Sequence, residues 1–442
     1  MQTTNAILLM YYHPPTAYAP TVMDSINSFS TYSQFKIYPV NPHLGYPKAL
    51  DNLQFKVIIL HYSMFGSATY VISPPYYKLL ERHADAHKVW ICQDECYNHK
   101  QRTQFANRYK ISCIYSCLKP QYFDEVYLSR CPSVKKVIPT LTGYVSESMV
   151  DNARKFAKQY ERRTIDVGYR AREVPSYLGL GGLEKMEIAK KFLTYANGTD
   201  LNLDIKCKEE DRIYGDHYWK WLGNLKAILG VESGGSIFDL DNEVWDEYNR
   251  KLGKESWAMG DRAIGYEELD PEILKKWENK IQYRAISPRC FEAAAFRICQ
   301  VMTLGEYNGI MQSNRHYIPI EKDFSNFHQA ISQMRSQKGR EIVEQAHKDL
   351  IASGKYSFQK FIEQFDEELA AGGFNPSVGK EEAKILGKLL RQQQNSLKNR
   401  FERLLYAPYY NKYPGKKYLM PIAQPAGQLY FRLKGYKKGK VG

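Results

Sequence analysis

The 442-residue sequence has no apolar run that approaches the roughly 20 residues needed to span a bilayer. Residues 1–12 have neither a basic start nor a small-residue cleavage site, so we expect no secretory signal and a cytoplasmic protein with reduced thiols. Cys92 with Cys96, and Cys113 with Cys117, have the spacing of zinc ligands. Both pairs begin inside apolar, strand-like runs, which favours buried thiols and predicts no bound metal.

Acidic residues are in the minority. The chain has 62 Lys and Arg against 48 Asp and Glu, a net charge of +14, while its 43% hydrophobic and 25% charged content is ordinary for a globular protein. A basic balance predicts anionic partners: nucleic acid, anionic lipid headgroups or phosphorylated small molecules. Composition does not choose among the three. The length predicts two or three domains with a large buried core.

The first 150 residues alternate short apolar runs with helical segments. This pattern indicates a parallel sheet covered on both faces, and ligands of such sheets bind at the carboxyl ends of the strands. Each residue at those ends also has an ordinary explanation as a loop, core or helix-capping residue, but together they favour a cleft. The polar residues at these ends are His13, His61, Asp94, Glu95 and Ser116.

A second alternating series follows a charged helical connector, and its first strand ends at Arg170. A later strand leads into a glycine-rich loop whose backbone N–H groups would suit an anion. No Lys-Ser or Lys-Thr follows, so the loop is not a P-loop. The residues of the loop are Glu232, Ser233, Gly234, Gly235 and Ser236.

These patterns predict three regions. Residues 1–150 would form a first α/β domain and residues 151–350 a second one, interrupted by a charged and aromatic insertion at about 239–286. Residues 351–442 would form a helical extension that ends in a basic, Tyr-rich tail. Basic residues interleaved with aromatics suit nucleic acid, a membrane surface or a solvated chain end.

The stretch 287–303 combines a helix start with candidate ligand-binding side chains. Ser287 is a hydroxyl cap, Pro288 pre-sets the first helical φ, and an alanine run continues the helix. A phosphate would fit the free N–H groups at this start, with Arg289 as its charged partner. Glu292, one turn inside, would face the same cleft and hold a ribose diol. The alternative is a capped helix whose Arg and Glu merely face solvent.

The segment Ser287-Pro288-Arg289-Cys290-Phe291-Glu292-Ala293-Ala294-Ala295 resembles the donor-binding helix of a group of GT-B glycosyltransferases. This is the spore-maturation (CgeB-like) and glycosyl-transferases group 1 type, often met among bacterial surface-polysaccharide enzymes. Four more stretches are similar to that group: 166–170, 209–215, 230–236 and 315–319. The resemblance covers about 164–336 strongly and the first domain more weakly, through Gln93-Asp94-Glu95.

The resemblance implies an α/β protein of the GT-B class, with two Rossmann-like domains facing across a cleft and a helical C-terminal extension. The donor, a nucleotide sugar, would lie on the second domain and the acceptor on the first. Glu292 would bind the ribose, Arg289 and Arg170 the diphosphate, and the loop from Glu232 to Ser236 phosphate or sugar. The candidates for a catalytic base across the cleft are Asp94, Glu95 and His13.

Two regions depart from the group's pattern. Many of its members carry a second glutamate eight positions before the helix glutamate, where this chain has Arg284. The glycine expected after the alanines is Arg297, and the usual nearby proline is Cys299. A tight turn that needs φ > 0 does not readily take arginine.

We therefore expect a metal-independent glycosyltransferase that moves a sugar from a nucleotide sugar to a hydroxyl of a glycan or lipid-linked glycan. It would need no cofactor besides that co-substrate and would be cytoplasmic, with peripheral binding to the inner, anionic face of a membrane. Nucleic acid is the less favoured partner. The alternatives are a non-catalytic GT-B-like protein that binds nucleic acid or another anion, and a sugar-nucleotide epimerase.

Overall fold

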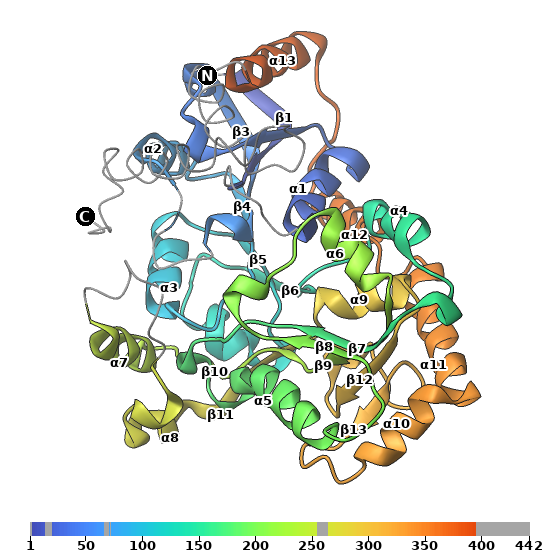
Figure 1. The fold of residues 1–442 in the computed structure, drawn as a ribbon. Helices are drawn as coiled ribbons and strands as arrows, with labels where there is room; N and C mark the ends of the chain where they lie inside the picture. The colour runs from blue at the N-terminus through green and yellow to red at the C-terminus, as the bar shows by residue number, and fades with distance from the viewer. Residues whose placement is uncertain (1, 14–19, 66–69, 71, 254–263, 395–442) are drawn as a thin grey trace, which may run out of the picture.

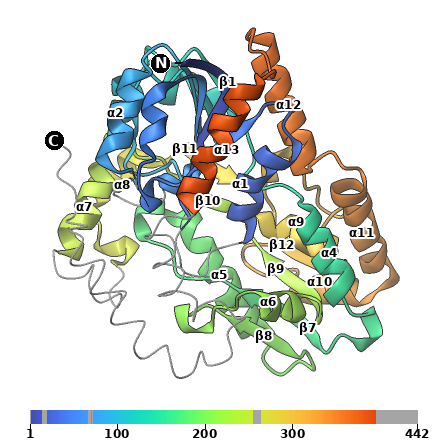
Figure 2. The same cartoon turned by 90° about the horizontal axis from the view of Figure 1, so that it is seen from above.

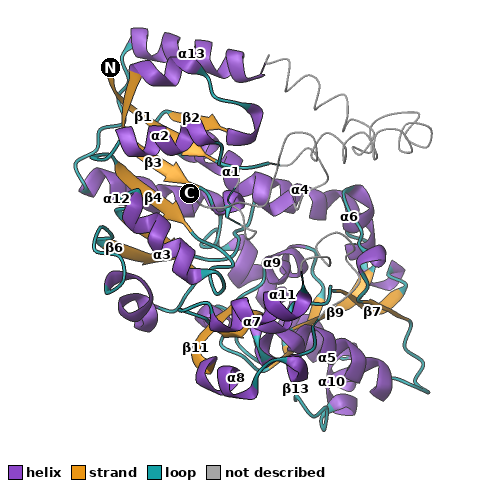
Figure 3. Ribbon diagram, turned by 90° about the vertical axis from the view of Figure 1, so that its left-hand side faces the viewer, coloured by secondary structure: helices purple, strands orange, loops and turns teal. Residues whose placement is uncertain are grey.

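The computed structural model describes residues 2–13, 20–65, 70, 72–253 and 264–394. They form two parallel sheets, each enclosed by helices, which lie one above the other in Figure 1 and are coloured by element type in Figure 3. No helix within these ranges is both long and apolar enough to cross a membrane.

The first sheet has six parallel strands in the order β2-β1-β3-β4-β5-β6. In β1, the side chains of Ala6, Leu8 and Met10 enter one hydrophobic core, and those of Ile7 and Leu9 enter the core on the opposite face. All five are fully buried, which explains why the strand reads as a continuous apolar run. The strands are β1 (Gln2–Met10), β2 (Ile37–Val40), β3 (Leu53–Leu60), β4 (His87–Ile91), β5 (Cys113–Ser116) and β6 (Lys136–Pro139), and the helices α1 (Pro20–Tyr32), α2 (Pro74–Arg82) and α3 (His99–Arg108).

The second sheet has five parallel strands in the order β13-β12-β9-β7-β8, and α4 (Glu147–Phe156) leads into it from the first domain. Its strands are β7 (Ile165–Arg170), β8 (Leu203–Lys206), β9 (Leu225–Gly230), β12 (Cys299–Thr303) and β13 (Ile318–Ile320). Its helices are α5 (Leu180–Tyr195), α6 (Asp216–Leu222), α9 (Pro288–Ala295), α10 (Phe327–Arg335) and α11 (Gln337–His347). The predicted α/β class with two Rossmann-like domains is thereby confirmed.

The C-terminal helices return to the first domain. Helix α12 (Phe358–Ala371) lies beside α1, where the rings of Phe361 and Phe365 meet the ring of Phe29 edge-on at 6.2 and 5.3 Å. Helix α13 (Lys380–Gln394) packs near β1 and β2, and Glu382 accepts a hydrogen bond from the Asn5 N–H at 3.1 Å. Figure 2 shows both helices over this domain. The predicted helical extension is present to residue 394, and the predicted tail lies outside the described residues.

The insertion packs on the first domain although its chain leaves from and returns to the second. It begins earlier than the predicted residue 239, because it contains the antiparallel strands β10 (Ser233–Ile237) and β11 (Glu278–Ala285) as well as α7 (Glu243–Leu252) and α8 (Pro271–Trp277). Phe238 and Tyr283 share a hydrophobic core with Trp90 and Phe105, and the ring of Trp245 stacks on a tyrosine of the first domain, Tyr97, at 5.1 Å. The insertion therefore joins the two domains through a continuous core.

The prediction of a loop at the glycine-rich segment is wrong, because residues 233–237 form strand β10. Gly234 pairs with Arg284, and Gly235 with Tyr283, in the antiparallel ladder. Gly234 has φ +90°, and a Cβ there would lie 1.9 Å from the Tyr283 carbonyl oxygen; one at Gly235 would lie 2.3 Å from the Leu178 carbonyl oxygen. Close backbone packing therefore requires these glycines, and the contact of residues 232–236 with a donor stays a prediction.

Arg297 occupies the left-handed turn for which the sequence pattern expects glycine. Its φ is +49°. The Ile298 N–H donates to the Ala293 carbonyl at 2.9 Å and the Arg297 N–H to the Ala294 carbonyl at 3.2 Å, the paired bonds of a Schellman cap. The Arg297 carbonyl in turn accepts a 2.8 Å hydrogen bond from Arg163. The turn that ends α9 is thus kept despite the arginine.

Replacing Arg297 with glycine is expected to raise the free energy of unfolding by about 0.5–1 kcal/mol, because the cost of the left-handed conformation exceeds the extra chain entropy of glycine. Urea unfolding measures this change. Arg297→Ala is the matched control, since it removes the same ion pair to Glu344 but keeps the unfavourable φ. Equal stability of the two variants would contradict the assignment.

Candidate active site

The start of helix α9 lies at the junction of the two domains. The Ser287 hydroxyl accepts the Arg289 N–H at 3.3 Å, as expected for a capping residue. Just before it, the Ile286 carbonyl accepts a 2.5 Å hydrogen bond from Thr142 in the connector from the first domain, and the Ile286 N–H donates to Asn308 at 2.6 Å. The predicted helix start is therefore confirmed, and it is held from both sides.

Glu292 is a buried carboxylate on this helix, with 8% of its surface exposed. The Tyr218 hydroxyl of α6 donates to its Oε2 at 2.5 Å. Burial raises the pKa of Glu292, while the bond from Tyr218 and the charge of Arg289 act in the opposite direction. When ionised, a carboxylate held in this way is a strong acceptor for a pair of hydroxyl groups, and its role as a ribose ligand stays a prediction.

Arg289 lies where several elements of the second domain meet. Its guanidinium carbon is 5.8 Å from the ring centroid of Tyr169 on β7, and its side chain hydrogen-bonds Tyr218. Burial raises the pKa of Cys207, after β8, and the charge of Arg289 opposes this shift; burial lowers the pKa of Lys185 on α5, and the charge of Arg289 adds to that shift. Desolvation would lower the pKa of Arg289, but the two tyrosines and the carboxylate of its own helix raise it, so the group stays cationic.

Lys185 is a site residue that sequence reasoning missed. Burial lowers its pKa to about 8, and the positive charges of Arg289, Arg172 and Arg284 contribute, whereas Asp94 of the first domain opposes the shift. No carboxylate in the described part of the chain lies within ion-pair distance of its ammonium group. The signal in the sequence was a lysine one turn into the helix that follows a glycine-rich loop.

Arg170 does not join this group. Its guanidinium forms a 2.6 Å ion pair with Asp204 on the neighbouring strand, donates to the Tyr169 and Asp204 carbonyls, and stacks on Trp221 at 4.7 Å. Only 12% of the side chain is exposed. These contacts fit a structural role between β7 and β8 rather than the predicted contact with a diphosphate.

Glu232 follows β9 and is held by two partners. Its Oε1 accepts the Tyr307 N–H at 2.9 Å, and its Oε2 lies 3.4 Å from Nε of Arg284. Arg284 also donates to the Gly181 carbonyl at 2.7 Å and pairs with Glu184. The arginine that replaces the group's second glutamate is therefore neutralised by two carboxylates. Of the other residues of the predicted loop, the Ser236 hydroxyl accepts the Gly181 N–H at 2.6 Å, and Ser233 of β10 pairs with Ala285 of β11.

Of the three candidates for a catalytic base, Asp94 is exposed at the carboxyl end of β4 and acts electrostatically on Lys185. Glu95 is fully buried: Ser116 and the Cys117 N–H donate to its Oε1 at 2.9 and 2.8 Å, and Tyr127 donates to its Oε2. Burial raises the pKa of Glu95. These contacts fit a structural carboxyl, and the structure favours Asp94.

His13 lies at the carboxyl end of β1, as expected, and its carbonyl accepts a 3.2 Å hydrogen bond from Asn41. Burial lowers the pKa of its imidazole, which favours the neutral form. The neighbouring predicted strand-end residue His61 is fully buried between the hydroxyls of Ser25 and Ser63, at 3.1 and 2.9 Å. His13 stays a candidate, whereas His61 is a hydrogen-bonded core histidine.

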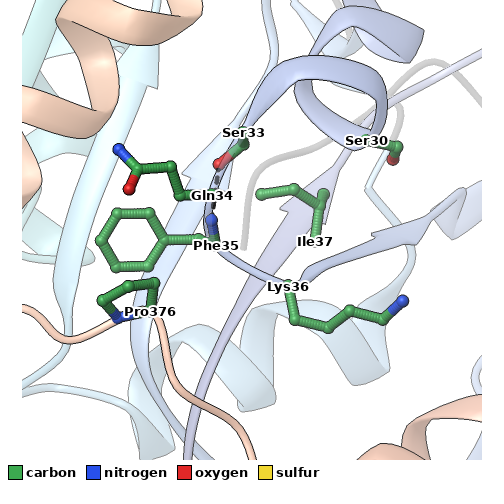
Figure 4. A pocket seen from close by; sticks show the side chains of 7 residues that line it. All are labelled: Ser30, Ser33, Gln34, Phe35, Lys36, Ile37 and Pro376. Carbon is green, nitrogen blue, oxygen red and sulfur yellow. Dashed lines mark hydrogen bonds between the residues drawn. The ribbon is translucent and has the colours of Figure 1, made fainter.

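A surface pocket lies elsewhere, between the end of α1 and the chain that leads to α13 (Figure 4). Asp366 holds its wall by accepting the Ser33 hydroxyl at 2.8 Å and the Gln34 N–H at 2.6 Å. It contains none of the predicted site residues. Its lining consists of Ser30, Ser33, Gln34, Phe35, Lys36, Ile37 and Pro376.

All eight cysteines are free thiols, and seven of them are buried. Burial raises the pKa values of Cys92, Cys96, Cys113 and Cys117, which suits apolar packing. Among the described residues, no group of three or more His, Cys, Asp or Glu side chains is arranged to hold a metal ion. The buried-thiol interpretation of the two cysteine pairs is confirmed.

No protein-family model and no curated protein matches the chain. Similar solved structures include TarM, at 13% identity and a TM-score of 0.35, over 70% of this chain and 53% of TarM. An α-glucosyltransferase in complex with UDP and a 13-mer DNA containing a HMU base has 12% identity and a TM-score of 0.45, over 82% and 99%. Anabaena HepE in complex with UDP and glucose has 11% identity and a TM-score of 0.41, over 84% and 100%.

The chain thus spans about half the length of TarM and nearly all of the other two proteins. At these identities the similarities assign no activity to it. The narrower resemblance to the CgeB-like group stays a prediction.

Replacing Glu292 with glutamine is expected to raise the urea midpoint at about pH 7.5 and to leave it unchanged near pH 4. Because burial raises the folded-state pKa of Glu292, the wild type loses stability as pH rises through that pKa, and the neutral amide removes this loss. Unfolding curves at several pH values measure the difference. Glu344→Gln, at an exposed position, serves as the control. A gain that does not change with pH would contradict the burial argument.

Proposed function

We propose that the protein transfers a sugar from a nucleotide sugar to a hydroxyl group of a glycan or lipid-linked glycan, without a metal ion. The observation that carries this proposal is the convergence of two cations, Lys185 and Arg289, with a buried carboxylate, Glu292, at the start of α9. Two cations and a helix N-terminus suit a diphosphate, and the carboxylate suits a ribose diol.

In the reaction, an acceptor oxygen bonds to the anomeric carbon while the bond from that carbon to the diphosphate oxygen breaks. The electron pair of the broken bond goes to the diphosphate, whose added charge Lys185, Arg289 and the N–H groups of α9 would stabilise. The half-buried position of the cations strengthens this effect, because their charges are less screened than in water. This supports transfer without a metal ion.

The acceptor hydroxyl also loses a proton. Asp94 is the base that its placement supports best, since it is exposed, belongs to the first domain and acts electrostatically on Lys185 of the second. An inverting reaction needs such a base, whereas a retaining reaction would pass the proton to the leaving diphosphate.

Thermal shifts against UDP, GDP, ADP, CDP and dTDP, and then against their sugars, test the proposal. We expect one diphosphate to stabilise the protein, and Lys185→Met and Arg289→Met each to weaken its binding by about tenfold or more, the worth of one charge-assisted hydrogen bond. Arg315→Met is the control, because Arg315 is paired with Asp349 on the surface. Binding of none of the diphosphates, or equal binding by all four proteins, would refute the donor site.

We also propose that the basic tail attaches the protein to anionic membrane surfaces. Residues 395–442 contain eleven Lys and Arg and one acidic residue, so most of the net charge of +14 lies there. Tyrosines and phenylalanines interleave with these basic residues. Lys and Arg near an anionic membrane surface contribute about 1 kcal/mol each, and aromatic rings suit the interface.

Neutralising Lys434, Lys437, Lys438 and Lys440 with glutamine is expected to lower binding to phosphatidylglycerol vesicles by at least about tenfold. Vesicle sedimentation measures this, with phosphatidylcholine vesicles as the neutral control. Equal binding to both kinds of vesicle would contradict the proposal. Tight, salt-sensitive binding to an oligonucleotide with no binding to vesicles would instead favour nucleic acid as the partner.

A further inference from the structure

Strand β11 separates the two halves of the candidate site. Successive side chains of a strand point to opposite faces, and Tyr283 and Arg284 are successive residues of β11. Tyr283 is buried against the first domain, where it shares a core with Trp90 and contacts Phe238 at 6.0 Å between ring centroids. Arg284 points to the second domain, where it reaches Gly181.

Tyr283 holds the backbone of the candidate base. The Asp94 N–H donates to the Tyr283 hydroxyl at 3.1 Å, and the Asp94 carbonyl accepts a 3.1 Å bond from the buried guanidinium of Arg102. Asp94 has φ +52°, a left-handed conformation that few residues other than glycine adopt. Two side chains thus fix both polar backbone groups of a strained residue at the junction, and such strain clusters at functional sites.

Arg284 holds the donor half in the same way. It donates to the Gly181 carbonyl at 2.7 Å and forms an ion pair with Glu184, so it binds the first turn of α5 next to Lys185. Its Nε lies 3.4 Å from Glu232. Only 11% of its side chain is exposed, so these ion pairs are little screened by solvent.

We propose that Tyr283 and Arg284 are positioning residues that set Asp94, on the acceptor side, against Lys185 and Glu232, on the donor side. The two residues are neighbours on one strand, so the donor and acceptor groups are held at a fixed separation by a single peptide unit. This inference rests on the proposed function for its chemistry, but the positioning itself is measurable without any substrate.

Tyr283→Phe removes the hydroxyl and keeps the ring. We expect the Asp94 amide to exchange its hydrogen about three- to tenfold faster, because it loses its acceptor. The affinity for the diphosphate that binds the wild type should stay within about twofold, whereas turnover of the corresponding nucleotide sugar should fall by about three- to tenfold. Tyr266→Phe, which removes a 2.9 Å bond to Glu278 within the same insertion, is the control.

Arg284→Met should show the opposite result to Tyr283→Phe, with a change in diphosphate affinity and none in the exchange of the Asp94 amide. We expect about tenfold weaker diphosphate binding and faster amide exchange at residues 180–186, with exchange at Asp94 unchanged. Arg284→Lys keeps the charge and should recover part of the affinity, which also covers the case in which the methionine variant does not fold. Unchanged exchange at Asp94 in the Tyr283 variant, or at residues 180–186 in the arginine variants, would overturn the assignment.

The two proposals fail in different ways. If the wild type binds no nucleoside diphosphate, the donor site is refuted, and the exchange measurements still decide whether Tyr283 and Arg284 position these segments. If the diphosphate binds but both variants bind it, and turn over the corresponding nucleotide sugar, like the wild type, only the positioning role is refuted.

Discussion

The antiparallel pairing of β10 with β11 is the contact on which the arrangement of the two domains depends. Its backbones approach so closely that a Cβ at Gly234 would overlap the Tyr283 carbonyl. One face of the strand pair lies in the hydrophobic core of the first domain. The other face carries Arg284, which donates a hydrogen bond to the first turn of α5. Close-packed groups transmit small shifts rather than absorbing them. The distance between the two halves of the candidate site therefore depends on the pairing of β10 with β11.

The site itself is built from groups that destabilise the folded protein. Glu292 is a nearly buried carboxylate whose pKa is raised by burial, and Lys185 is a half-buried ammonium group whose pKa is lowered by burial. Placing either charge away from water is unfavourable unless a partner compensates. A bound diphosphate would supply that partner for the lysine. Arg170, by contrast, forms an ion pair with Asp204 inside the second domain, as expected for a cation with a structural role.

The sequence predicted the fold well wherever strands are buried on both faces, because such strands are continuous apolar runs, as in β1 and β3. It also predicted the capped start of α9, since Ser-Pro followed by alanines is a local signal. Local signals failed where the deciding partner is remote. The glycines of β10 were interpreted as an anion loop because their partner strand begins more than 40 residues later.

The same reason explains the errors at the site. The pairing of Arg170 depends on the adjacency of β7 and β8, and the pKa of Lys185 is lowered by burial and by arginines that lie far apart in the sequence. Neither the ion pair of Arg170 nor the lowered pKa of Lys185 can be predicted from a short stretch of sequence. Arg297 shows the reverse case. An arginine is unfavourable in a left-handed turn, yet the Schellman hydrogen bonds and the hydrogen bond from Arg163 stabilise the turn.

The path of the chain has a consequence for any movement between the domains. It passes between them near Thr142 and near Tyr356, and again at both ends of the insertion, next to Glu232 and Ser287. Two of these four crossings therefore lie within the candidate site. A rotation of one domain against the other would displace Glu232 and the start of α9 directly, rather than through a distant hinge. Closing of the domains and assembly of the site would then be one event.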